Sequence, residues 1–265
     1  MDALLAVIFT LLGISIGSFL NVCIDRLPAK RSLFFPRSGC DACNHSLTTA
    51  DLIPVISYLW LRGRCRYCQA KIPLRVVMVE AFTGALFLIA FLKFGVSAQF
   101  AVAAFWCCVF LVIIFIDWEH QLILNRITYP AAIAALVILG IDSLLKEPIF
   151  YPDRIYFPET AILSGLISAA ILLLIFLLII IISPRSMGMG DAKLVTLIGL
   201  VTGFPLVIFG MLIGVVIGGV VAIVLLSFKL KGRKDVIAYG TFLAIGPIIA
   251  MLWGNEILDW YLGLV

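Results

Sequence analysis

The strongest constraint on this chain is a succession of apolar runs, each near the roughly 20 residues that a helix needs to cross a bilayer. Charged residues make up only 13% of the 265 residues, against about 25% in soluble globular domains. Because backbone groups in lipid must bond within their own segment, such runs form helices. The sequence therefore predicts an all-α polytopic membrane protein. Breaking the runs at charges, Gly and Pro gives eight transmembrane helices, near 2–22, 76–94, 98–116, 127–145, 159–182, 192–203, 206–228 and 237–262.

The runs divide the chain into three predicted domains. Residues 1–23 form the first transmembrane helix, which we expect to be retained because it lacks the basic start of a signal peptide. Residues 24–75 are the one long polar stretch and form a small loop domain, and residues 76–265 form the membrane domain. The sixth helix is predicted to be short, because Pro205 in Gly203-Phe204-Pro205 would break a continuous helix.

Basic residues predict the orientation in the membrane, since cytoplasmic loops carry the excess of Lys and Arg. Sixteen of the 19 fall on the side that contains the 24–75 loop. We therefore expect this loop on the cytoplasmic side and both termini on the other. The net charge of +4 follows from this distribution, and we do not expect nucleic acid as a partner.

Two carboxylates at the ends of predicted spans are the candidate catalytic groups. Asp117 ends the third span and Asp191 opens the sixth, both on the predicted cytoplasmic side. If they meet, they can share one proton and act as the acid and base of an aspartic-protease pair. Gly188 and Gly190 lack Cβ atoms and allow close approach beside Asp191. A simpler interpretation is that both aspartates only mark helix ends at the headgroup boundary.

Four cysteines in the loop form two CxxC pairs. Cys40 and Cys43 are separated by 21 residues from Cys65 and Cys68, which is close to the spacing of a structural four-thiolate zinc site. A reducing compartment argues against disulfides, and zinc would supply folding free energy to a loop with little core. A redox dithiol or unliganded thiols remain the alternatives.

These features resemble the type IV prepilin peptidase family. Gly188-Met189-Gly190-Asp191 with the trailing Lys193 is similar to the family's GxGD motif, and Asp117 with the following His-Gln-Leu-Ile-Leu is similar to its other catalytic segment. The resemblance covers nearly the whole chain. The other matching motifs are Gly17-Ser18-Phe19-Leu20-Asn21-Val22, Arg26-Leu27-Pro28, Pro54-Val55-Ile56-Ser57-Tyr58 and Val79-Glu80. Two segments depart from the family pattern: Leu124-Asn125 stands where Pro-Asp is usual, and Ala238-Tyr239-Gly240-Thr241 stands where a Pro-Phe-Gly-Pro type segment is common.

The resemblance implies an endopeptidase of the bacterial inner membrane. Its substrates would be type IV prepilins or the pseudopilins of type II secretion, cut at the cytoplasmic face after a glycine that ends a basic leader. It also implies N-methylation of the new terminal residue with S-adenosylmethionine as cofactor, near Gly63-Arg64, where the family more often has Gly-Lys. From other classes, a membrane thiol redox protein and a proton-coupled transporter remain alternatives, although a transporter would favour carboxylates near mid-membrane.

Overall fold

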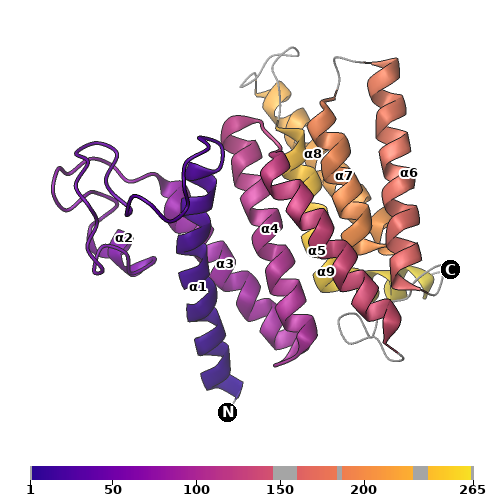
Figure 1. The fold of residues 1–265 in the computed structure, drawn as a ribbon, viewed down its shortest axis with the longest axis horizontal. Helices are drawn as coiled ribbons and strands as arrows, with labels where there is room; N and C mark the ends of the chain where they lie inside the picture. The colour runs from indigo at the N-terminus through magenta and orange to yellow at the C-terminus, as the bar shows by residue number, and fades with distance from the viewer. Residues whose placement is uncertain (1, 146–159, 184–186, 229–237, 264–265) are drawn as a thin grey trace. The chain divides into compact units, whose positions relative to one another are not determined.

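The computed structural model describes residues 2–145, 160–183, 187–228 and 238–263, and these ranges are helical apart from their connections. The helices are α1 (Asp2–Arg26), α2 (Ile56–Trp60), α3 (Leu74–Phe94), α4 (Ala98–His120), α5 (Asn125–Leu144), α6 (Ala161–Ile182), α7 (Met189–Thr202), α8 (Leu206–Ser227) and α9 (Tyr239–Leu262) (Figure 1).

Seven helices in the described ranges are long and apolar enough to cross a membrane, namely α1, α3, α4, α5, α6, α8 and α9. The predicted fold class is therefore confirmed: the chain is an all-helical, multi-pass membrane protein. The sixth predicted span corresponds to α7, which is not among these seven because its 14 residues make it only about 21 Å long. The short α2 was not predicted. The predicted starts of the fifth and eighth spans, residues 159 and 237, lie outside the described residues.

The chain forms two compact units, residues 1–112 and residues 113–265. In the first unit α1 packs on α3, and a Cβ at Gly17 would lie 2.7 Å from the Cα of Glu80. One polar side chain reinforces this helix pair, and another connects α3 to the segment before α2. Asn21 Nδ2 donates to the Val76 carbonyl at 2.9 Å, and the Glu80 carboxylate accepts from the Val55 N–H at 2.7 Å. Glu80 thus connects α3 to the segment that precedes α2.

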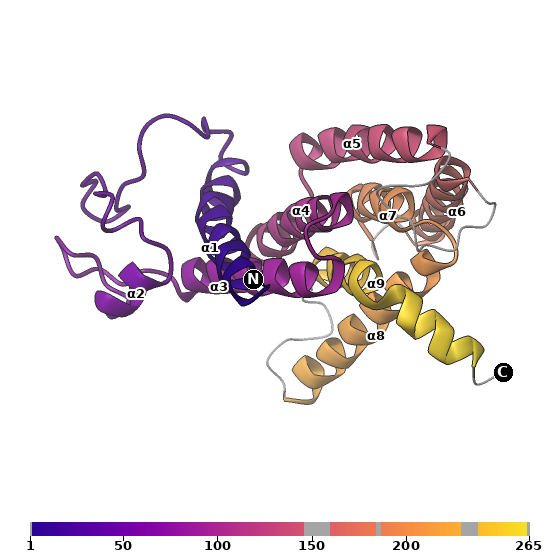
Figure 2. The same cartoon turned by 90° about the horizontal axis from the view of Figure 1, so that it is seen from below.

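The second unit is built around α7, which packs against α5, α6, α8 and α9 (Figure 2). Residues Leu194–Val195 and Leu197–Thr202 of this helix are buried, so the shortest membrane helix forms the centre of the unit. At its far end Gly203 adopts a φ of +66° and α8 begins at Leu206. The predicted break at Gly203-Phe204-Pro205 is therefore confirmed.

The polar side chain of Ser164 in α6 holds this turn. Its hydroxyl accepts from the Phe204 N–H at 2.9 Å and bonds the Phe204 carbonyl at 3.2 Å. Both main-chain groups of Phe204 are thereby satisfied in a partly buried turn, where an unpaired group would be costly. The end of α7 is fixed to a neighbouring helix.

The α8–α9 pair shows why α8 carries glycines at every fourth position. Gly210 and Gly214 face Gly246 and Leu243 of α9 so closely that a Cβ at Gly246 would overlap the Gly210 backbone. Small residues with this spacing let two membrane helices approach through their backbones. The stripe is a packing feature, as its spacing predicts.

Candidate active site

Asp117 lies in the last turn of α4, with 4% of its surface exposed. Its Oδ2 accepts two hydrogen bonds from Thr241 at the start of α9, one from the N–H at 2.6 Å and one from the hydroxyl at 3.0 Å. Neither bond uses Oδ1. Thr241 therefore orients the carboxylate through one oxygen and leaves the other for a proton or a water molecule.

Asp191 is the third residue of α7, where the first turn leaves main-chain N–H groups without helical acceptors. Its Oδ2 accepts from the Gly188 N–H at 3.2 Å, so the carboxylate folds back over the helix start and a negative charge there is favoured by the helix dipole. The sequence predicted a helix that begins at residue 192, just after Asp191, whereas α7 begins at Met189. In the structure, Asp191 lies within the first turn and its side-chain direction is set by the helix.

The two aspartates come together through the segment that follows α4. Ile123 in this segment contacts both glycine positions: a Cβ at Gly190 would lie 3.2 Å from Ile123 Cβ, and one at Gly240 would lie 3.0 Å from Ile123 Cδ1. A Cβ at Gly240 would also lie 3.0 Å from Asp117 Oδ2. The starts of α7 and α9 thus both contact Ile123, just past the end of α4.

Lys193, the lysine that trails the motif, points to α5. Its Nζ donates to Asn125 Oδ1 at 2.9 Å and lies 5.6 Å from the centre of the Tyr129 ring. Asn125 is one of the departures from the family pattern, and here its neutral amide still provides an acceptor for the ammonium. Lys193 therefore connects the start of α7 to the start of α5.

The four loop cysteines form one cluster. The sulfur atoms of Cys40, Cys43, Cys65 and Cys68 all lie within 4.8 Å of one another, and those of Cys40 and Cys68 are 3.7 Å apart. A tetrahedral zinc site with Zn–S bonds of about 2.3 Å places its sulfurs about 3.8 Å apart. A disulfide would require about 2.05 Å. The donor set and its dimensions fit zinc.

Both CxxC pairs adopt the same local turn. Asn44 and Gln69, the residues after each pair, have φ of +54° and +59°. The pairs are closed by matching bridges, Gly39 with Ser46 and Arg64 with Lys71. Hydrogen bonds from main-chain N–H groups of Cys68 and Tyr67 lower the pKa of the Cys65 thiol to about 7, which favours the thiolate that binds metal.

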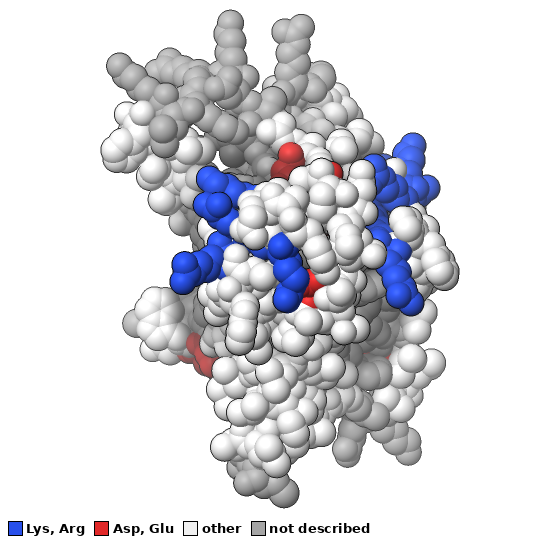
Figure 3. All heavy atoms as spheres, turned by 90° about the vertical axis from the view of Figure 1, so that its left-hand side faces the viewer, with Lys and Arg blue, Asp and Glu red and all other residues white. Residues whose placement is uncertain are grey.

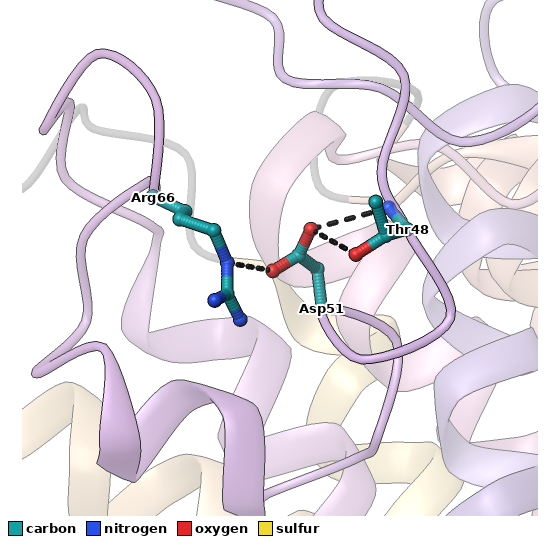
Figure 4. A network of polar contacts seen from close by, with 3 residues as sticks. All are labelled: Thr48, Asp51 and Arg66. Atoms are coloured by element: carbon teal, nitrogen blue, oxygen red, sulfur yellow. Dashed lines mark hydrogen bonds and ion pairs between the residues drawn. The ribbon is translucent and has the colours of Figure 1, made fainter.

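A polar network joins the flanks of the two turns (Figure 4). Asp51 Oδ2 accepts from the Thr48 N–H and hydroxyl at 3.1 and 2.7 Å, and Asp51 Oδ1 accepts from Arg66 Nε at 2.7 Å. Burial alone would raise the pKa of Asp51, but the bonds from Thr48 and Arg66 outweigh it and lower that pKa. Arg66 lies inside the second CxxC pair, so the ion pair connects one cysteine turn to the segment that follows the other.

Gly63 and Arg64 lie in the turn between α2 and the second cysteine pair. Gly63 has a φ of +68°, and a Cβ there would lie 2.9 Å from the Tyr58 hydroxyl oxygen. This glycine is therefore needed for the turn, because Tyr58 occupies the space where a side chain at position 63 would lie. Arg64 is exposed next to it.

Sequence reasoning did not identify Thr241 and Gly240 as site residues. Both belong to a segment that it noted only as a departure from a family pattern. Thr241 supplies the two donors to Asp117, and Gly240 provides the space for that carboxylate. A polar residue next to a glycine at the start of a membrane helix, in the position of a family motif, is the signal that could have found them.

A buried carboxylate, Asp117, and a half-buried one, Asp191, lie at helix ends in a bundle of helices long enough to span a membrane, and this defines the class: a multi-pass membrane protein with two neighbouring acidic helix ends. Comparison with known proteins gives the family. The model of the bacterial peptidase A24 N-terminal domain matches residues 11–94, and that of the type IV leader peptidase family matches residues 102–223. The chain belongs to the type IV leader peptidase family.

Curated relatives match along almost the whole chain. The prepilin leader peptidase/N-methyltransferase of Legionella pneumophila is 31% identical over 279 residues, which are 96% of this chain and 93% of the relative. The Bacillus subtilis protein of the same name is 28% identical and covers 98% of both chains. That of Aeromonas salmonicida is 29% identical over 96% of this chain and 93% of its own. No solved structure matches.

Proposed function

We propose that this chain is an endopeptidase of the bacterial inner membrane that removes the basic leader of type IV prepilins or type II secretion pseudopilins at the cytoplasmic face. The observation that carries the proposal is that Ile123 contacts both Gly190, next to Asp191, and Gly240, which lies against Asp117, so that the ends of α4 and α7 bring the two aspartates to one place. Membership of the peptidase family and the printed names of the relatives support the substrate class.

The chemistry needs one carboxylate to accept a proton from water while the other donates one to the leaving amine. Two carboxylates that interact titrate as a pair, so a single shared proton serves both roles. Thr241 orients Asp117 and the helix start orients Asp191. A substrate with a basic leader and an apolar stem would present its junction at the membrane boundary.

The alternatives are less well supported by the contacts. Both aspartates lie within one turn of a helix end, whereas a proton relay favours carboxylates near mid-membrane. The dimensions of the cysteine cluster fit four thiolates around zinc, and we propose a structural role for that metal in a loop domain of residues 24–75, distinct from the first helix (1–23) and the membrane domain (76–265).

The test is cleavage of a purified full-length prepilin by the detergent-solubilised enzyme. Asp117→Asn and Asp191→Asn should each abolish cleavage, because an amide cannot carry the shared proton. Asp142→Asn is the matched control: Asp142 is also a buried carboxylate in a membrane helix, but it lies in α5, and this variant should keep cleavage. Normal processing by either active-site variant would refute the paired assignment.

We also propose that the enzyme methylates the new N-terminus, as the names of its relatives say of those proteins. S-adenosylmethionine would supply the methyl group when bound. The exposed Arg64 is the candidate contact, and Gly63 shapes the turn that presents it. Mass spectrometry of the cleaved product with cofactor present tests this step, and a product without the added methyl mass would refute it.

A further inference from the structure

A cavity of about 580 Å³ lies between α1 and the segment that leads into the cysteine cluster. Phe19, Val22 and Arg26 of α1 line one side. Leu33, Phe34 and Arg37 are among the residues that line the other. Its volume is within the usual range for small-ligand sites. It is separate from the paired aspartates and contains neither Gly63 nor Arg64.

The charge of the cavity is positive. Arg26 and Arg37 line it, and none of the lining residues is acidic. Arg26 is fixed in place, because its guanidinium donates to the carbonyls of Ser32 at 2.9 Å and Pro36 at 2.7 Å. Arg37 is exposed at the rim. A ligand that fits this site carries a negative charge.

The surroundings are also basic. Residues 24–75 contain nine Lys and Arg but three Asp, a net charge of +6, and two of the three acids are in ion pairs, Asp51 with Arg66 and Asp25 with Arg75. Figure 3 shows the basic side chains gathered over this face of the molecule. A second copy of this loop would be repelled from it.

Large apolar side chains are exposed on the same loop. Phe34, which lines the cavity, is 76% exposed, and on α2 Leu59 and Trp60 are 66% and 81% exposed. Figures 1 and 2 show that the loop lies beside the Arg26 half of α1 and not beyond its end. Exposed Trp and Phe next to Lys and Arg are typical of the membrane interface.

We propose that this cavity binds the headgroup of an anionic phospholipid, in the leaflet at the Arg26 end of α1. The phosphate would lie between Arg26 and Arg37, and the acyl chains would lie along the Phe19 side of α1 and beneath Phe34. The apolar face of α2, with Leu59 and Trp60, would rest in the same headgroup layer. The site does not depend on proteolysis or on methyl transfer.

The test is lipid retention by the full-length protein, measured by native mass spectrometry from a neutral detergent with equal phosphatidylglycerol and phosphatidylcholine. The wild type should retain phosphatidylglycerol preferentially. Arg37→Gln should lower that retention about fivefold, the effect of losing one basic residue at an anionic surface. Arg62→Gln is the matched control, since Arg62 is an exposed arginine of the same loop outside the cavity, and it should keep wild-type retention.

Two further measurements separate a lipid from other occupants. Phe34→Ser should also lower retention of phosphatidylglycerol, because the acyl chains lose their contact, and millimolar inorganic phosphate should not displace the lipid. Equal retention of the two lipids, equal behaviour of the Arg37 and Arg62 variants, or displacement by phosphate alone would overturn the proposal. So would lipid retention that appears only in a protein dimer.

Discussion

Replacing Thr241 with Val tests whether α9 positions the Asp117 carboxylate for the proposed cleavage. Valine has nearly the same shape but lacks the hydroxyl, which lies 3.0 Å from Asp117 Oδ2 and 3.3 Å from the Ile114 carbonyl oxygen. A hydroxyl has a single proton, and the shorter distance favours the carboxylate. The main-chain N–H bond of 2.6 Å is retained in the variant, so the change removes one of two donors.

The magnitude follows from the kind of bond. A hydrogen bond to a charged group contributes about 1.5 to 3 kcal/mol, which corresponds to about 10- to 150-fold in rate if the bond is made in the transition state. Because Thr241 bonds Asp117, kcat should fall within this range while KM changes little. Thr241→Ser keeps the hydroxyl and should stay within about threefold of the wild type.

The assay is the initial rate of prepilin cleavage at several substrate concentrations, with the thermal unfolding midpoint of each variant measured in parallel. Thr196→Val is the matched control. Its hydroxyl, on α7, donates to the Ala192 carbonyl of its own helix, so its loss should leave kcat unchanged. A Thr241→Val enzyme with wild-type kcat, or one whose only defect is in KM, would refute the positioning role.

Three further outcomes are expected. Gly240→Ala should lower cleavage more than tenfold, because its Cβ would lie 3.0 Å from Asp117 Oδ2, whereas Gly219→Ala, with nothing within 4 Å, should be silent in the same assay. Cys40→Ser should lose bound zinc, measured by elemental analysis, and expose the 24–75 loop to hydrogen exchange; unchanged metal content would contradict the four-thiolate site. Asp51→Asn should destabilise the loop by less than about 1 kcal/mol, since its partner is half exposed. The lowered pKa of Asp51 means that the ion pair is intact above about pH 4 and is lost only on further acidification, so a deficit that varies between pH 5 and 8, followed by hydrogen exchange, would contradict its assignment.

The membrane helices could be predicted because hydrophobic length is a local property. Pro205 marked the break between α7 and α8, and the glycines of α8 have the spacing of a close helix contact, which α9 provides in the structure. The start of α7 was placed less well. The prediction began the helix after Asp191, since a charge reads as the end of an apolar run, but the carboxylate bonds the Gly188 N–H and belongs to the first turn.

The residue that donates hydrogen bonds to Asp117 could not be predicted, because it depends on which helix end lies beside the end of α4. Thr241 is 124 residues away along the chain, and no local pattern connects the two. α2 was missed for a related reason. Its five residues are too few for a periodic pattern, and the Glu80 carboxylate of α3 helps to fix its start by bonding the Val55 N–H. The cysteine cluster was predictable because the spacing of CxxC pairs directly encodes a metal geometry.

The central position of α7 gives its length a specific meaning. Its far end is fixed to α6 through Ser164 and Phe204, and its other end carries Asp191, so the number of residues between them sets how deep that carboxylate lies in the membrane. Each residue added or removed would move it by about 1.5 Å and rotate it by about 100°. Cleavage at a fixed point along a membrane-embedded substrate would then depend on the count of residues in this one helix, and insertions should be tolerated in the connections but not between Asp191 and Gly203.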